Sequence, residues 1–142
     1  MVQRKNLRRE RGFTLLELLV VVAVIGLITS LLLVGITQRE RTAKAKAIMG
    51  ELDQVRKQAE EFYVTNGSYQ GLCTSDQNLT EKGRLGELRV SIQEKGGELK
   101  CLSSASEYAV SSSLSDGDYW CVDSQGFSGQ INSDVENTFC SD

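Results

Sequence analysis

The chain has 142 residues, of which 40% are hydrophobic and 25% are charged, and its formal net charge is −3. This length is typical of one domain, and the charged fraction is ordinary for a water-exposed surface. Because the sequence contains no histidine, it excludes Ser-His and Cys-His nucleophile chemistry and any histidine-ligated metal site.

The N-terminal part of the chain is divided into a basic segment and an apolar one. Residues 1–12 contain five basic side chains and one acid, a net charge of +4, whereas residues 13–38 carry a single charge. The 19 residues from Leu18 to Ile36 are uncharged and would form about 28 Å of helix, close to the hydrocarbon thickness of a bilayer. A secretory signal peptide has an apolar region of only about 7–15 residues. The sequence therefore predicts a membrane-embedded helix over 13–38.

Glu17 does not fit a plain membrane anchor. A carboxylate four residues into an apolar helix costs free energy in lipid, by something under the ~3 kcal/mol reported for charges at a helix centre. An ionisable side chain inside a membrane segment indicates a function, and it requires a partner.

The run Arg11-Gly12-Phe13-Thr14-Leu15-Leu16-Glu17 resembles the class III signal of type IV pilins and pseudopilins. The resemblance implies that a prepilin peptidase cuts between Gly12 and Phe13 on the cytoplasmic side, removes residues 1–12 as a leader and N-methylates Phe13. It also implies that Glu17 pairs with the α-ammonium of Phe13 from a neighbouring subunit. A buried ion pair of this kind sets register more than strength.

Residues 39–65 are predicted to continue the helix on the water-exposed side. Apolar side chains recur there at 4-3-4-3 spacing, on Ile48, Leu52, Val55, Ala59 and Phe62. This stripe is expected to cover a small sheet, although a coiled-coil seam of about two heptads is an alternative. Asn66-Gly67 predicts the helix end, so the helix runs from about 13 to 65.

Residues 66–106 are interpreted as the region that connects the helix to the sheet. Leu85, Leu88 and Ile92 suit a short helix, whereas Leu88, Val90 and Ile92 suit a strand. Periodicity alone leaves both alternatives open.

The last part, 107–142, is predicted to hold an antiparallel sheet and a C-terminal segment. Strands are expected over 108–114, 119–124 and 127–131, with turns at 115–118 and 125–126. The expected fold class is α+β, a type IV pilin-like long N-terminal helix packed on a small antiparallel sheet.

Four cysteines lie behind the apolar segment, at positions 73, 101, 121 and 140. An even number there suggests two disulfides outside the cytoplasm, and the sequence permits three pairings. The resemblance favours Cys121–Cys140, because type IV pilins often pin the C-terminal segment to the sheet by a disulfide. Cys73–Cys101 would then close the connecting region.

Asp116 and Asp118 flank Gly117 in the turn after the first predicted strand. Two carboxylates could contribute to a calcium site, and major pseudopilins have a calcium site near their sheet. A turn is the favoured interpretation, because a third acid does not converge on the pair. No cofactor is predicted.

These features predict a structural subunit rather than an enzyme. After processing by the prepilin peptidase and methyltransferase, it would polymerise with other copies of itself on a pilus assembly platform. The precursor would lie among lipids of the cytoplasmic membrane with its N-terminus inside, and the mature form would stand in a type IV pilus-like cell-surface fibre. No specific nucleic acid is expected as a partner. The alternatives are a pseudopilin of a type II secretion or competence apparatus and a membrane-anchored, disulfide-bonded binding ectodomain.

Overall fold

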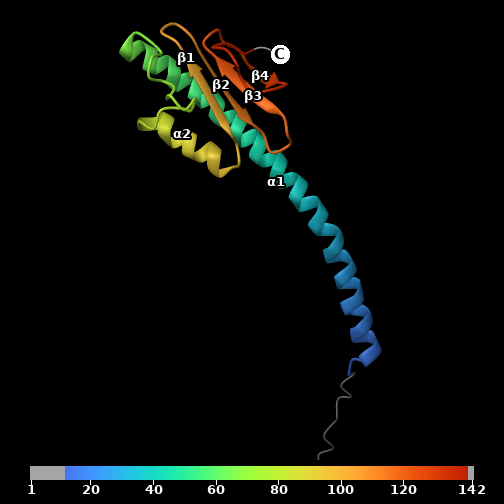
Figure 1. Cartoon of the computed structure of the whole chain (residues 1–142). Coiled ribbons are helices and arrows are strands. Elements are labelled where there is room, and N and C mark those ends of the chain that lie inside the picture. Colours follow the sequence, from blue (N-terminus) through green and yellow to red (C-terminus); the bar gives the residue numbers. More distant parts are fainter. Residues whose placement is uncertain (1–11, 141–142) are drawn as a thin grey trace, which may run out of the picture. The chain divides into compact units, whose positions relative to one another are not determined.

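A computed structural model describes residues 12–140, except for the side chains of 31–36. Two helices and four strands follow one another along the chain (Figure 1): α1 (Leu15–Asn66), α2 (Gly83–Glu94), β1 (Leu99–Ser103), β2 (Tyr108–Ser113), β3 (Tyr119–Asp123) and β4 (Ser128–Ile131). The chain divides into two compact units, residues 1–38 and 39–142. The expected leader lies outside the described residues, apart from its last residue, Gly12. The α+β fold class is confirmed for the second unit, in which helices pack on one small antiparallel sheet.

The sheet is an antiparallel meander in the order β1-β2-β3-β4. Three of its strands lie where the sequence predicted them, and Gly117 and Gly126 in the predicted turns have φ of +96° and +93°. Such values favour glycine, because a Cβ atom is strained there. The fourth strand, β1, was not predicted and pairs with β2, with Cys101 opposite Val110. It was missed because its apolar residues Leu99, Cys101 and Leu102 do not alternate with polar ones, so the sequence shows no clear period-2 pattern.

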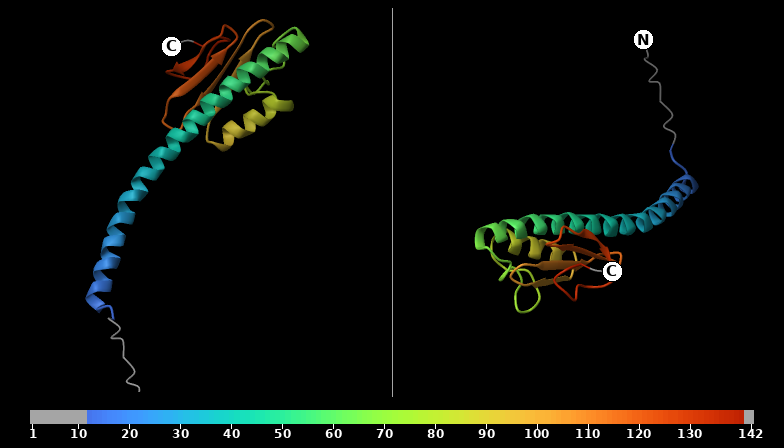
Figure 2. Two further views of the ribbon diagram at one scale, coloured as in Figure 1. Left: turned by 180° about the vertical axis from the view of Figure 1, so that it is seen from behind. Right: turned by 90° about the horizontal axis from the view of Figure 1, so that it is seen from above.

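The second half of α1 covers the inner face of this sheet (Figure 2). The predicted apolar stripe supplies the helix side of the core: Ile48, Leu52, Val55 and Ala59 are completely buried, and Phe62 packs against them. Tyr108, Val110 and Val122 lie in the same core on the sheet side. The stripe therefore packs on a sheet, as expected, and the helix ends at Asn66, one residue beyond the predicted end.

The connecting region contains more regular structure than the sequence predicted. Of the two alternatives left open, the helix is correct, since α2 buries Leu85, Leu88 and Ile92 and leaves Val90 half exposed. The close approach that follows needs a glycine: a Cβ atom on Gly97 would lie only 2.6 Å from the Ser112 hydroxyl oxygen. Because the backbone at Gly97 can pass close to Ser112, β1 can begin soon after the end of α2 along the chain.

A polar network joins α2 to α1 at the edge of the core. The Ser91 hydroxyl and the Lys95 ammonium donate to Glu51 Oε1 over 2.6 and 2.9 Å. Farther towards the N-terminus of the same unit, Lys44 pairs with Glu40 over 2.8 Å, as the i,i+4 spacing leads one to expect. Lys44 donates to the Glu40 carboxylate and thereby lowers the pKa of Glu40.

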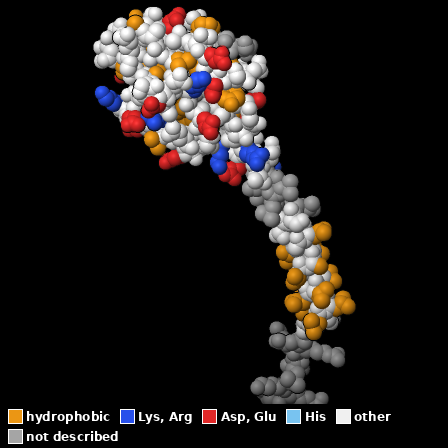
Figure 3. Space-filling model, in the orientation of Figure 1, with side chains coloured by type: hydrophobic (Ala, Val, Ile, Leu, Met, Phe, Trp, Pro, Cys, Tyr) orange, Lys and Arg blue, Asp and Glu red, His pale blue; other side chains and the backbone are white. Residues whose placement is uncertain are grey.

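The first unit consists of the N-terminal part of α1. Among the residues that the structure describes, none of the helices combines the length and apolarity required to cross a bilayer. The predicted uncharged run ends in residues 31–36, whose side chains lie outside the described part of the chain. Apolar side chains are exposed along the described part of this helix, and Figure 3 shows them on one face.

Candidate functional site

The predicted cleavage bond lies in exposed, non-helical backbone. Gly12 and Phe13 precede α1, and the Phe13 side chain is 77% exposed. A Cβ atom added to Gly12 would meet nothing within 4 Å, so packing within the described chain does not require glycine at this position. Exposed, non-helical backbone is the conformation in which a protease can reach a peptide bond.

Glu17 lies in the first turn of α1, where it forms a reciprocal cap with Thr14. The backbone N–H and the hydroxyl of Thr14 donate to Glu17 Oε2 over 3.4 and 3.3 Å, and the Glu17 N–H donates to Thr14 Oγ1 over 3.3 Å. This capping box was not among the predicted features, although T-x-x-E spacing is a sequence signal for it. The carboxylate also benefits from the positive end of the helix dipole.

On the C-terminal side of this cap, apolar side chains are exposed on all sides of the helix. Leu15 is 86% exposed, Leu19 is 67% exposed and Leu27 is 69% exposed, and the half-exposed residues between them are Val20, Val21, Val24 and Ile25. A helix that is apolar all round is stable when its surroundings are apolar. The described part of the first unit therefore presents a continuous apolar surface.

The second unit contains two disulfides, and all four cysteines take part in them. Cys73 is joined to Cys101, and Cys121 is joined to Cys140, with Cα–Cα distances of 5.4 and 6.0 Å. These are the pairs expected from the resemblance. The first ties the connecting region to β1, and the second ties the C-terminal segment to β3.

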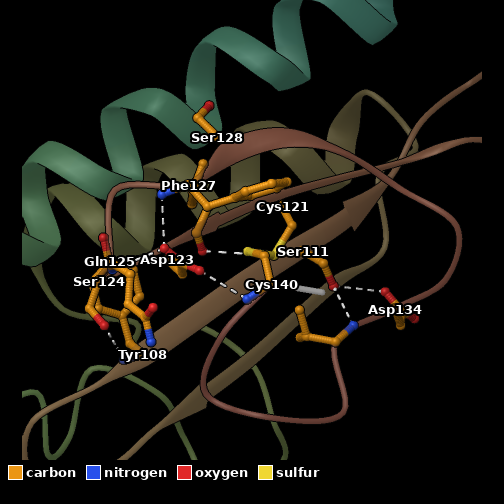
Figure 4. Close-up of a disulfide and its surroundings, with 12 residues drawn as sticks. Tyr108, Ser111, Cys121, Asp123, Ser124, Gln125, Phe127, Ser128, Asp134 and Cys140 are labelled. Atoms are coloured by element: carbon orange, nitrogen blue, oxygen red, sulfur yellow. Dashed lines mark hydrogen bonds between the residues drawn. A yellow bond between two sulfur atoms is a disulfide. The ribbon is translucent and has the colours of Figure 1, made fainter. Parts of the chain in front are cut away.

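The outer face of the sheet carries a second, smaller apolar cluster under the C-terminal segment. Ala109, Cys121, Ile131 and Val135 are buried there, and Cys140 packs against them. Figure 4 shows this disulfide and the polar side chains around it. The segment is thus held by a disulfide, an apolar contact and hydrogen bonds.

Asp123 was not singled out from the sequence, yet the residue is only 3% exposed and its carboxylate accepts hydrogen bonds from three backbone N–H groups. The N–H groups of Gln125 and Phe127 donate to Oδ1, and the N–H of Cys140 donates to Oδ2, each over 2.9 Å. The signal for the first two bonds was an aspartate directly before the Ser-Gln-Gly turn. The third bond joins residues 17 positions apart, which local sequence cannot reveal.

Asp116 and Asp118, which were considered as a calcium site, lie in a hydrogen-bonded turn. The N–H of Asp118 donates to Asp116 Oδ1 over 3.4 Å, and the N–H of Leu114 donates to the Asp118 carbonyl over 2.7 Å. Within residues 12–140, no cluster of three or more acidic or cysteine side chains is arranged to hold a metal ion.

Two tyrosines line the end of the core next to α1. The Tyr69 hydroxyl donates to Glu60 Oε1 over 3.0 Å, and the Tyr69 and Tyr108 rings lie 4.8 Å apart. Burial, together with the hydrogen bond to Glu60, raises the pKa of Tyr69 to about 12. Burial also raises the pKa of Tyr108. Both phenols are therefore neutral at physiological pH and act as packing groups.

Comparison with known proteins locates one motif. Residues 7–33 match the prokaryotic N-terminal methylation motif, a range that contains Gly12, Phe13, Thr14 and Glu17. No curated protein and no solved structure matches the chain. The chain carries, over residues 7–33, the class III prepilin signal of type IV pilins and pseudopilins.

Proposed function

We propose that this protein is a pilin, a structural subunit that polymerises into a type IV pilus-like fibre after leader cleavage and N-methylation. The observation that carries the proposal is the position of Glu17. It is the fifth residue after the expected cut, inside a methylation motif and at the start of a helix whose apolar side chains are exposed.

The exposed apolar helix supports both stages of this function. Before assembly, lipid acyl chains would cover Leu15, Leu19 and their neighbours, so the precursor would stand in the cytoplasmic membrane with its N-terminus inside. After assembly, the corresponding helices of other copies would replace the lipid. In both states the apolar surface stays out of contact with water. Burial of such surface is the main driving force for association.

Cleavage would create the partner that Glu17 requires. The new α-ammonium forms at Phe13, next to the Thr14 N–H that Glu17 accepts in this structure. In a stack of parallel helices, the carboxylate of one subunit would pair with the Phe13 ammonium of its neighbour. Leaving one partner of such a buried pair alone costs roughly 3–5 kcal/mol. The pair would therefore select one axial register.

The second unit would form the outward-facing head of the subunit. Its two disulfides suit an oxidising compartment outside the cytoplasm. A fibre on the cell surface has no surrounding envelope to protect it, so two covalent ties in a head of modest core size favour a surface pilus over a pseudopilus. The partners are other copies of the chain, the prepilin peptidase and methyltransferase, and the assembly platform. The role is not enzymatic.

The test compares cells that make this protein with cells that lack it. Sheared fibres are examined by electron microscopy, and the subunit in them is measured by mass spectrometry. We expect fibres only in the producing cells, built from a subunit that begins at an N-methylated Phe13. Fibres that contain subunits with an intact leader, or equal fibre numbers in both strains, would contradict the proposal.

A further inference from the structure

We propose that Asp123 is a positioning residue for oxidation of the head: its carboxylate holds Cys140 beside Cys121 and so selects this pair among the three possible pairings. The inference goes beyond the proposed function, because it concerns how the head acquires its covalent structure. It holds whether the fibre is a pilus or a pseudopilus.

Asp123 and Cys121 lie on the same face of the sheet. They are two residues apart in β3, and side chains at i and i+2 of a strand point to the same side. This is the outer face, where Cys121 is buried in the cluster that the C-terminal segment covers. Figure 4 shows the carboxylate between the turn that follows β3 and the N–H of Cys140.

The three bonds to Asp123 join the turn and the C-terminal segment through one rigid group. Oδ1 is occupied by the Gln125 and Phe127 N–H groups, which fix the side chain's orientation, and Oδ2 remains for Cys140. Asp123 is a buried residue, only 3% exposed, and a buried carboxylate is tolerated when such donors replace water. Hydrogen bonds to an ionised acceptor are also roughly twice as strong as neutral ones.

The backbone N–H of Cys140, and not its sulfur, donates to Asp123, so this hydrogen bond does not depend on the oxidation state of the sulfur. Other contacts hold the segment farther from the cysteine: the Ser111 hydroxyl donates to Asp134 over 2.9 Å, and the Thr138 hydroxyl donates to Glu107 over 3.0 Å. Asp123 acts on residue 140 itself. It can therefore bring the Cys140 thiol to Cys121 before the disulfide forms.

The chemical step is thiol–disulfide exchange with an external disulfide, for which oxidised glutathione is the probe. The thiolate of one cysteine attacks the glutathione disulfide, and the second thiolate then displaces glutathione from the mixed disulfide. One S–S bond forms in the protein and one breaks in the oxidant. Two electrons and two protons pass to the two glutathione thiols. A tether that raises the local concentration of the second thiol favours this last displacement.

The test measures the equilibrium between each disulfide and glutathione in the full chain, purified in detergent. Asp123→Asn keeps the size of the side chain but replaces the charged acceptor of the Cys140 N–H. We expect the equilibrium constant for Cys121–Cys140 to fall at least tenfold, in line with the loss of a charge-assisted hydrogen bond. The equilibrium constant for Cys73–Cys101 in the same molecule should change less than about twofold, because the hydrogen bonds of Asp123 do not involve either of these cysteines. A change of this size is within the usual scatter for independent sites.

Asp118→Asn is the matched control, since it makes the same chemical change at an exposed turn. It should leave both constants unaltered. The proposal is overturned if Asp123→Asn leaves Cys121–Cys140 as strong as in the parent chain, or if it weakens both disulfides equally.

A second measurement covers the case in which Asp123→Asn does not fold. In the double variant Cys121→Ser and Cys140→Ser, no disulfide holds the C-terminal segment. We expect the amide of position 140 still to exchange its hydrogen at least tenfold more slowly than in an unstructured peptide, since its bond to Asp123 remains. Exchange at the unstructured rate would overturn the proposal.

Discussion

The Glu17 carboxylate accepts hydrogen bonds from both the backbone N–H and the hydroxyl of Thr14, over 3.4 and 3.3 Å. The residue whose charge is least expected in an apolar helix thus has a local partner in the single chain. In the fibre that we propose, a stronger partner, the Phe13 ammonium of a neighbour, would compete for the same oxygens. Assembly would then exchange hydrogen bonds from neutral donors for an ion pair with a charged one.

A first prediction concerns the residue before the cut. Gly12→Val should leave the fold unchanged, because a Cβ atom at this position meets no atom within 4 Å. It should nevertheless block removal of residues 1–12, since we expect the peptidase to cut directly after the glycine of the prepilin signal and a bulkier side chain would stand at the scissile bond. Immunoblots of membranes should show only precursor. Gly26→Ala is the control, because Gly26 is equally free of close contacts and its substitution should be processed normally.

The second prediction tests the core between α1 and the sheet. Leu52 is completely buried, so Leu52→Ala should lower the free energy of unfolding of the head by about 2–5 kcal/mol through lost burial and a residual cavity. Val64 lies on the same helix but is 84% exposed. Val64→Ala should change that free energy by less than about 0.5 kcal/mol. Similar values for the two variants in urea denaturation would contradict the packing described.

Tyr108 and Tyr69 offer a matched pair of hydroxyl deletions. In the described chain the Tyr108 hydroxyl is buried without a hydrogen-bond partner, whereas the Tyr69 hydroxyl donates to Glu60. Tyr108→Phe should therefore raise the free energy of unfolding by about 1 kcal/mol, and Tyr69→Phe should lower it by about as much. Thermal denaturation of both variants checks the opposite signs.

The raised pKa of Tyr69, about 12, also predicts a pH dependence. An unfolded tyrosine ionises at a pKa of about 10, so the folded state disfavours the phenolate. The contribution of Tyr69 to stability is complete below pH 10 and is lost as the pH rises towards 12. The free energy of unfolding should fall over this interval, and the fall should be smaller in Tyr69→Phe. Equal slopes for the parent chain and the variant would refute the assignment.

Sequence patterns were sufficient where one period extended over many residues. The stripe from Ile48 to Ala59 repeats over several helical turns and predicted both the helix and its buried face. Elements with an irregular pattern were less accessible. The helix α2 was ambiguous, and β1 was missed because adjacent Cys101 and Leu102 break the alternation of apolar and polar residues.

For the candidate site, the motif around Gly12 and Glu17 could be found from the sequence because its residues are contiguous. The Thr14–Glu17 cap was also visible as T-x-x-E, but the prediction gave Glu17 a partner in another subunit instead. The contact between Asp123 and Cys140 could not be found in this way. It depends on the path of a C-terminal segment without regular structure, which packing and not local preference determines.

The central claim is that Glu17 serves assembly by pairing with a neighbouring subunit. Glu17→Val removes a carboxylate that lipid disfavours, so the variant should insert into the membrane and be cut after Gly12 as well as the parent protein. Thr14→Val is the matched control, because it deletes the hydroxyl of the cap and retains the Glu17 carboxylate.

The decisive measurement is the amount of each processed subunit in sheared fibres relative to the amount in the membrane. We predict that Glu17→Val is processed normally but is absent from fibres, because it leaves the neighbour's Phe13 ammonium unpaired in an apolar stack at a cost of about 3–5 kcal/mol. Thr14→Val should enter fibres at a level close to that of the parent protein. Glu17→Val subunits that enter fibres at the parental level, or a loss of Thr14→Val subunits as large as that of Glu17→Val, would contradict the account.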